Sequence, residues 1–275
     1  MERLRTAQLY LLDLLKLFKK ICEAEGIPYF LVGGTLLGAV RHRGFIPWDD
    51  DIDVALFRDD YDRFPDIAKS YLSDGVAVEH YTLNPAYQDY TMKIVNRNVV
   101  YVTERQNGLF RQNAWLDIFP LDGLPESRVG RFAQFRRLDY HRMLCSFHYI
   151  RDVRLDPERS WWKRALVAFA QTVPVGKLVD PSAEKRALDR IFKECPLDAS
   201  SLIGIYMGAY HGREVYPKAW FESGRVAEFE GETYRIPAGT EAYLTRLYGD
   251  YTRLPPPEQR VPKHHIIRIE FSGEA

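Results

Sequence analysis

The stretch of residues 33–54 constrains the fold of this chain more than any other part of its sequence. It reads GGTLLGAVRHRGFIPWDDDIDV and follows an apolar run at residues 28–32 that predicts a strand. Residues 36–40 predict a helix, with Thr35 as its N-cap. This order of strand, two glycines and helix start favours an anion-binding site. The backbone N–H groups at a helix start have no partner within the helix, and they and the helix dipole point at a bound anion. We therefore expect a phosphate to bind at Gly33, Gly34 and Thr35.

The end of this stretch places Asp51 and Asp53 two positions apart at the start of an apolar run. Residues i and i+2 of a strand share a face, so a strand at residues 51–57 would aim both carboxylates at one point. Acidic runs are more often solvated loops or helix caps, but apolar residues on both sides put this one at a buried edge. Two buried like charges need a cation, and oxygen ligands favour a hard ion. The pair therefore predicts a site for Mg²⁺ or Mn²⁺.

A third carboxylate is expected at Asp117, the one acid in the apolar strand predicted at residues 114–119. A charge in such a strand needs a partner, so Asp117 is predicted to face Asp51 and Asp53 as a metal ligand. The alternative is an acid on an edge strand that points to water. Asp122, two residues after Pro120, is predicted to lie in a turn.

Four further side chains are candidates for substrate binding. Arg41 follows the glycine turn closely enough to reach a donor phosphate, unless it is only surface charge. Lys93 lies in an apolar strand and would need a phosphate or the metal carboxylates as counter-charge. Trp48 would stack on a base or cap a quaternary ammonium, or pack beneath the acidic loop. His264 would donate to the acceptor or the leaving phosphate, although such a histidine is more often structural or solvated.

The composition is that of a globular enzyme. Lys plus Arg and Asp plus Glu both total 38 in 275 residues, so no overall basic field points to nucleic acid. The three cysteines are far apart and form no metal spacing, which predicts free thiols in a reducing cytoplasm. No signal peptide opens the chain, and no apolar run is long enough to span a bilayer.

Patterning along the chain predicts a core at residues 1–125, a helical insertion at 126–199 and a part at 200–275 that completes the catalytic domain. The core opens with an amphipathic helix and has a second helix at residues 58–73. Its strands are predicted at residues 28–32, 51–57, 77–83, 90–95, 98–103 and 114–119.

The insertion is rich in basic residues, including Arg136 and Arg137, and we expect it to shape the acceptor side of the site. Residues 161–175 fit either a helix in a membrane interface or a helix in a core, and the sequence leaves both open. The basic excess favours a peripheral contact with the inner face of the membrane.

The order of the motifs carries a resemblance to known families. Gly-Gly, then Asp-x-Asp on a strand, then one Asp on a later strand resembles the nucleotidyltransferase (polymerase-β-like) superfamily. The string GGTLLGAVRHRGFIPWDDDIDV with WLDIFPLD resembles the LicD family, which includes the fukutin-type proteins. Asp60, Tyr61 and Phe64 resemble its pattern as well. So do LYGDY at residues 247–251 and LPP at 254–256, so that the first 125 and roughly the last 40 residues are covered specifically.

This resemblance implies an α+β fold, with a mixed sheet flanked by helices. It also implies transfer of a phosphorylated alcohol from a CDP-activated donor, CDP-choline or CDP-ribitol, to a hydroxyl of a glycan or lipid-linked oligosaccharide. Phosphocholine is the first choice, with teichoic acid or lipopolysaccharide as the glycan. Two Mg²⁺ ions are expected: Asp51 and Asp53 would hold one, and Asp117 would share the second or accept the proton of the hydroxyl.

Three alternatives remain. The same carboxylates would serve a nucleotidyltransferase that moves an NMP from an NTP. A glycosyltransferase also uses Asp-x-Asp, although there the motif generally lies deeper in the chain. The third alternative is a non-catalytic module for glycan assembly or membrane docking, against which the presence of all three acids speaks.

Overall fold

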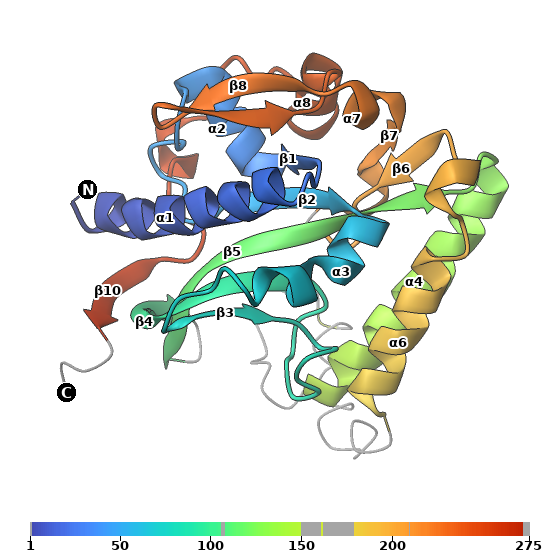
Figure 1. Ribbon diagram of the computed structural model, residues 1–275, viewed down its shortest axis with the longest axis horizontal. Coiled ribbons are helices and arrows are strands. Elements are labelled where there is room, and N and C mark those ends of the chain that lie inside the picture. Colours follow the sequence, from blue (N-terminus) through green and yellow to red (C-terminus); the bar gives the residue numbers. More distant parts are fainter. Residues whose placement is uncertain (1, 106–107, 150–160, 162–178, 209, 272–275) are drawn as a thin grey trace. The chain divides into compact units, whose positions relative to one another are not determined.

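The computed structural model describes residues 2–105, 108–149, 161, 179–208 and 210–271 (Figure 1). The chain folds as two compact units. Unit 1 comprises Met1–Asp122 and Ser201–Ala275, and unit 2 comprises Gly123–Ser200. The division at residues 125 and 199 into a catalytic core, a helical insertion and a part that completes the catalytic domain stays a prediction, since these units are defined by compactness alone.

Unit 1 is built on a mixed sheet, which confirms the predicted α+β class. The strand order is β1-β2-β5-β4-β10. Only the pairing of β2 with β5 is parallel along this path; the other neighbours are antiparallel. The strands are β1 (Tyr29–Leu31), β2 (Asp53–Phe57), β4 (Met92–Arg105), β5 (Gly108–Leu124) and β10 (Ile266–Phe271).

Shorter strands extend this sheet. β3 (Val76–Glu79) pairs with β4, and β6 (Leu202–Gly204) pairs with both β5 and β7 (Val215–Pro217). The separate hairpin of β8 (Arg225–Phe229) and β9 (Glu232–Ile236) packs on α2 and β1 (Figure 1).

Helices complete unit 1. α1 (Glu2–Ala24) buries the predicted apolar stripe, because its side chains at helical spacing pack on the sheet. These buried side chains include Leu11, Leu14, Leu15, Phe18 and Cys22. The other elements are α2 (Gly33–His42), α3 (Arg58–Ala68), α7 (Ala219–Ser223), α8 (Thr240–Tyr248) and the 3₁₀ turns η4 (His211–Arg213) and η5 (Pro257–Gln259).

Unit 2 contains α4 (Arg128–Tyr149), α6 (Pro181–Phe192) and the 3₁₀ turn η3 (Leu197–Ala199). α4 and α6 lie side by side (Figure 1), and the Gln134 amide donates to the Ile191 carbonyl at 3.0 Å. The predicted basic patch is partly neutralised inside the unit, since Arg137 donates two hydrogen bonds to Glu194 and Arg136 pairs with Asp139. Residues 162–175 of the predicted interfacial helix lie outside the described residues.

Several predicted elements have different bounds. The helix predicted at residues 58–73 ends at Ala68, and the strand predicted at 77–83 ends at Glu79. The strands predicted at 90–95 and 98–103 form one strand, β4, whose pairing with β5 is irregular between Asn96 and Val100. An irregularity of this kind breaks the alternation of side chains, which is why the pattern indicated two strands.

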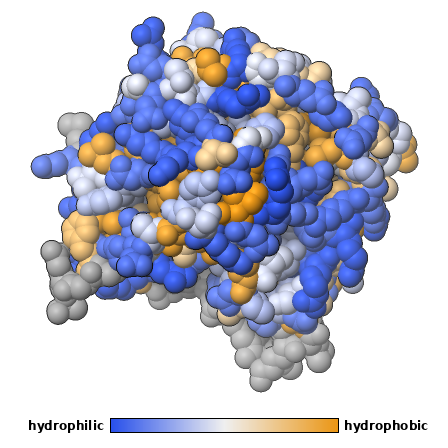
Figure 2. All heavy atoms as spheres, viewed as in Figure 1, coloured by the Kyte–Doolittle hydropathy of each residue, from blue (hydrophilic) through white to orange (hydrophobic). Residues whose placement is uncertain are grey.

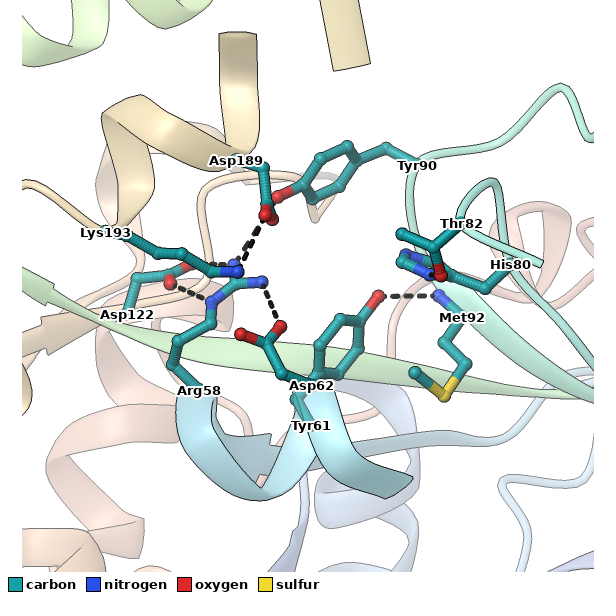
Figure 3. Close-up of polar contacts among 10 residues, drawn as sticks. All are labelled: Arg58, Tyr61, Asp62, His80, Thr82, Tyr90, Met92, Asp122, Asp189 and Lys193. Carbon is teal, nitrogen blue, oxygen red and sulfur yellow. Dashed lines mark hydrogen bonds and ion pairs between the residues drawn. The ribbon is translucent and has the colours of Figure 1, made fainter. Parts of the chain in front are cut away.

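The prediction that Asp122 lies in a turn is wrong. Asp122 is part of β5 and is 2% exposed, and its carboxylate accepts two hydrogen bonds, at 2.6 and 2.8 Å, from Arg58 at the start of α3 (Figure 3). Arg58 also donates to Asp62 at 3.4 Å. Pro120, which suggested the turn, continues the strand, because it pairs with Leu56 of β2.

Hydrophilic residues dominate the face shown in Figure 2, with apolar residues in small groups between them. Among the helices of the described residues, none combines the length and apolarity that crossing a bilayer requires.

We expect Asp122→Ala to lower the free energy of unfolding by about 3–5 kcal/mol, because it leaves the Arg58 guanidinium buried without its main counter-charge. Urea denaturation measures this. The matched control is Asp66→Ala, which removes an exposed carboxylate paired with Lys69 at 2.7 Å and should change stability by less than about 1 kcal/mol. Equal effects of the two substitutions would contradict the assignment.

Candidate active site

A cavity of about 1230 Å³ in unit 1 gathers most of the predicted site residues. Its wall includes two further aspartates, Asp49 and Asp89, and the C-terminal Lys263. Of the predicted residues, all but Thr35 line it: Gly33, Gly34, Arg41, Trp48, Asp51, Asp53, Lys93, Asp117 and His264.

The sheet brings Asp53, Asp117 and Lys93 together. In the parallel pairing of β2 with β5, Asp53 is opposite Asp117, and in the antiparallel pairing of β5 with β4, Asp117 is opposite Lys93. These three residues therefore lie side by side on neighbouring strands. The Lys93 ammonium is 3.7 Å from the Asp117 carboxylate and 2.8 Å from that of Asp89, and the Trp115 indole donates to Asp117 at 2.8 Å.

Asp51 lies just before β2, not within it, so the prediction of a strand at residues 51–57 is wrong for its first two positions. Strand alternation therefore does not explain why Asp51 faces the cavity. A loop places it there, and its carboxylate accepts a hydrogen bond from Lys263 at 3.1 Å. Ile52, the residue after Asp51, anchors the loop to β5, since its carbonyl accepts a hydrogen bond from the Asp117 N–H at 2.9 Å.

The two glycines make room for carboxylates. A Cβ on Gly33 would lie 2.9 Å from Asp53 Oδ2, and a Cβ on Gly34 would lie 2.9 Å from Asp49 Oδ2, so side chains there would collide with acids. Gly33 also has φ +54°, a conformation that glycine adopts without strain. Its N–H already donates to the Tyr243 hydroxyl at 3.1 Å. Phosphate binding at this turn stays a prediction.

Thr35 is not the predicted N-cap of α2. The helix begins at Gly33 after Val32, and no side chain caps it. Thr35 is 3% exposed within the first turn, and its hydroxyl accepts a hydrogen bond from the Asp53 N–H at 2.9 Å. The threonine thus ties α2 to the start of β2.

Burial, together with the crowding of acids, raises the pKa values of three carboxyl groups at the cavity wall, those of Asp49, Asp53 and Asp117. For Asp53, burial is the main cause, followed by repulsion from Asp51 and Asp117, and its pKa lies well above the ordinary value. The pKa of Asp49 is raised in the same way, by burial and then by Asp51. Burial also raises the pKa of Asp117, although Lys93 and the Trp115 hydrogen bond oppose the shift.

Two lysines offset part of this charge. Burial alone would lower the pKa of Lys263, but attraction to Asp51 and Asp53 outweighs it and the net shift is upward. The same balance, with Asp117 and Asp89, raises the pKa of Lys93. Sequence reasoning missed Lys263, because nothing in the local pattern before β10 connects it with residues 51–53.

His264 holds the acidic loop from the opposite end of the chain. Its backbone N–H donates to Asp50 Oδ2 at 2.9 Å, and its ring Nδ1 lies 3.0 Å from Asp50 Oδ1. Asp50 is fully buried. The imidazole also packs edge-on against Trp115 at 4.9 Å. The predicted phosphate contact of His264 stays a prediction, but a structural contact is evident.

Arg41 and Trp48 lie on the cavity wall near the segment after α8. The Arg41 guanidinium donates to the carbonyls of Tyr251 and Arg253 at 3.0 and 3.3 Å, and burial lowers its pKa. The Trp48 ring is 5.8 Å from the Arg260 guanidinium. Arg41 thus helps to hold this segment in place.

The donor set of the acidic cluster fits a hard divalent cation. Asp51, Asp53 and Asp117 offer carboxylate oxygens alone, and their mutual repulsion is what a cation would relieve. Within the described residues, no three His, Cys, Asp or Glu side chains already converge as a ready-made metal-binding group.

Glu214 is a further cavity residue that sequence reasoning missed, since a single acid in an aromatic-rich segment carries no motif. It is 4% exposed, and burial raises its pKa to about 8. Among the described atoms its Oε2 has no hydrogen-bond partner, while the backbone of Tyr210 supplies a hydrogen bond to the carboxyl group.

Aromatic side chains can contact a ligand only where they line the cavity. Tyr87, Trp115, Tyr210 and Tyr248 do so. Tyr90, Tyr101 and Tyr206 are buried and do not line it.

The chain is similar to known proteins over the segments that carry these motifs. The family model described as LicD/FKTN/FKRP, nucleotidyltransferase domain, matches residues 26–129. The lipopolysaccharide cholinephosphotransferase LicD of Haemophilus influenzae is 33% identical over 275 aligned residues, which cover 96% of both chains.

Shorter matches connect the chain with mammalian proteins. The ribitol 5-phosphate transferase FKRP of Mus musculus is 28% identical over 103 residues, which cover 35% of this chain and 21% of that protein. The ribitol-5-phosphate transferase FKTN of Mus musculus is 37% identical over 68 residues, or 25% and 14% of the two chains. The α+β fold, the acidic cavity and these matches define an enzyme of the transferase class. The chain belongs to the LicD family.

The raised pKa of Glu214 predicts a pH-dependent stability. A carboxyl group whose folded pKa is about 8 instead of 4.5 favours folding only while it is protonated, so this contribution is complete below pH 4.5 and is lost as the pH rises through 8. Glu214→Gln, which stays neutral, should therefore match the wild type near pH 5 and exceed it by on the order of 3 kcal/mol at pH 9. Urea denaturation at both pH values tests this. A difference that does not depend on pH would rule out the buried, uncompensated carboxylate.

Proposed function

We propose that this protein transfers a phosphorylated alcohol, with phosphocholine as the first choice, from a CDP-activated donor to a hydroxyl of a cell-surface glycan or lipid-linked precursor. The observation that carries the proposal is the convergence of Asp51, Asp53 and Asp117 on one cavity, in a chain that aligns along 96% of its length with a lipopolysaccharide cholinephosphotransferase. The nucleotidyltransferase-type fold is part of this proposal, supported by the description of the matching family model.

In the proposed reaction, an oxygen of the acceptor attacks the phosphorus that carries the alcohol. The bond from that phosphorus to the bridging oxygen breaks, CMP leaves with the electron pair, and the acceptor gives up its proton. Asp117 would take this proton, and its raised pKa supports this role, because it brings a carboxylate closer to the range of a useful base.

Asp51, Asp53 and Asp117 would hold Mg²⁺ or Mn²⁺, two ions in the proposal. When bound, these ions would screen the donor pyrophosphate and lower the pKa of the attacking hydroxyl. The protein itself positions the acids through the register of β2 and β5 and offsets their charge with Lys93 and Lys263.

The place of action proposed is the cytoplasm, at the inner face of the membrane where lipid-linked precursors are anionic. The three free cysteines support a reducing compartment. The basic residues of unit 2 support contact with an anionic acceptor or membrane surface, an attraction that salt weakens.

A second candidate is nucleotidyl transfer, which the description of the family model favours. The two reactions release different products, since phosphoalcohol transfer from CDP-choline yields CMP, whereas nucleotidyl transfer from an NTP yields pyrophosphate. Chromatography of the products with each donor distinguishes them.

Asp53→Asn and Asp117→Asn should each lower the rate of CMP release from CDP-choline by at least roughly 100-fold, and EDTA should abolish it until Mg²⁺ is restored. The assay contains purified protein, acceptor glycan and Mg²⁺. The control is Asp66→Asn, an exposed aspartate on α3 whose replacement should leave the rate unchanged. Turnover that survives in EDTA or in both site variants would refute the proposed chemistry.

A further inference from the structure

Glu214 stands out among the titratable groups of the cavity, because the proposed chemistry gives it no task. It lies in the segment between β6 and β7, whose ends are joined by the hydrogen bond from Ile205 N–H to the Glu214 carbonyl at 3.2 Å. The Asp cluster has two lysines as counter-charge, whereas Glu214 Oε2 has no hydrogen-bond partner among the described atoms. A buried oxygen in this state needs an explanation.

The absence of a side chain at Gly208 lets the Glu214 carboxyl group lie close to the cavity. Gly208 lines the cavity, and a Cβ on Gly208 would lie 2.5 Å from Glu214 Oε2. The carboxyl group therefore occupies the place that a side chain at residue 208 would take. A charge here acts on the cavity through little intervening protein, where the low dielectric constant strengthens it.

Aromatic rings stand next to this charge. Tyr210 and Tyr248 both line the cavity and pack edge-on, with ring centroids 5.6 Å apart. The charge of Glu214 contributes to the raised pKa of Tyr210, after burial, and the charge of Asp53 also acts on both tyrosines. The two rings thus lie within electrostatic range of the acidic cluster as well as of Glu214.

A carboxylate with one oxygen that accepts no hydrogen bond among the described atoms, beside aromatic rings, suits a particular kind of ligand. A quaternary ammonium carries a positive charge but no N–H group, so it is attracted by a carboxylate and by ring faces without offering a hydrogen bond. A polyol would instead require donors and acceptors placed for its hydroxyl groups.

We propose that Glu214, Tyr210 and Tyr248 form the subsite that receives the quaternary ammonium head of the transferred alcohol. This inference rests on the proposed function and deepens it, since it assigns the choice of alcohol to a part of the cavity wall separate from the metal-binding carboxylates. The subsite selects choline over neutral alcohols by charge.

The decisive experiment compares two donors that differ only in charge: CDP-choline and its uncharged carbon isostere, CDP-3,3-dimethylbutanol. Titration calorimetry with Mg²⁺ at pH 9, where Glu214 with its pKa of about 8 carries its charge, gives the affinity of each. The wild type should prefer the choline donor by ~10-fold or more, and Glu214→Gln should reduce the preference to within ~3-fold, because the carboxylate charge is gone. Affinity for CDP itself should not change.

The matched control is Glu228→Gln, the same change at an exposed glutamate of β8, which should keep the full preference. Tyr210 supplies a second, independent pair of variants: Tyr210→Phe keeps the ring and should keep the preference, while Tyr210→Leu should lose several-fold of it. A full preference for choline in Glu214→Gln, or equal effects of the two Tyr210 substitutions, would overturn the inference.

If the proposed function is wrong, the binding experiment gives a result that differs from failure of the subsite alone. If no CDP-linked ligand binds the wild type, the donor class is wrong, and phosphocholine is then compared with 3,3-dimethylbutyl phosphate on the same variants. A preference for phosphocholine that depends on Glu214 would support the subsite by itself. Equal binding of the two phosphates to the wild type would overturn it.

Discussion

Repulsion between carboxylates is the constraint on which this structure depends. The parallel register of β2 and β5 fixes Asp53 beside Asp117, and the preceding loop adds Asp49 and Asp51. Burial makes the charges of Asp49, Asp53 and Asp117 more costly, as their raised pKa values show. The glycines that start α2, the Trp115 indole and the two lysines are the features that make such crowding tolerable.

The sequence predicted those parts of the site that local pattern determines. A lone acid in an apolar strand identified Asp117 as a residue facing the cavity, and the spacing of Asp51 and Asp53 identified the acidic cluster. The reason given for Asp51 was wrong, because β2 begins only at Asp53 and a loop presents Asp51. Asp122 was misplaced because a proline suggested a turn, whereas the strand continues and the carboxylate pairs with Arg58.

What could not be predicted depends on contacts between distant segments. Lys263 pairs with Asp51 across 212 positions, and His264 with Asp50 across 214. Glu214 has no motif around it, and only the folded chain shows that its Oε2 has no hydrogen-bond partner within the part of the chain that the structure describes. The mixed sheet was predictable as a class, but the pairing of β10 with β4, two strands far apart in the sequence, was not.

The pairing of the acidic loop with residues 263 and 264 has a consequence for synthesis of the protein. Domains generally begin to fold as the chain leaves the ribosome, N-terminal parts first. Strands β2, β4 and β5 emerge long before Lys263 and His264, so the nascent sheet carries its cluster of acids without these two partners. Solvent ions or protons must neutralise the cluster during that interval. Completion of the cavity therefore waits until residues 263 and 264 have been made, and a nascent chain halted before residue 263 carries the acidic loop without these two partners.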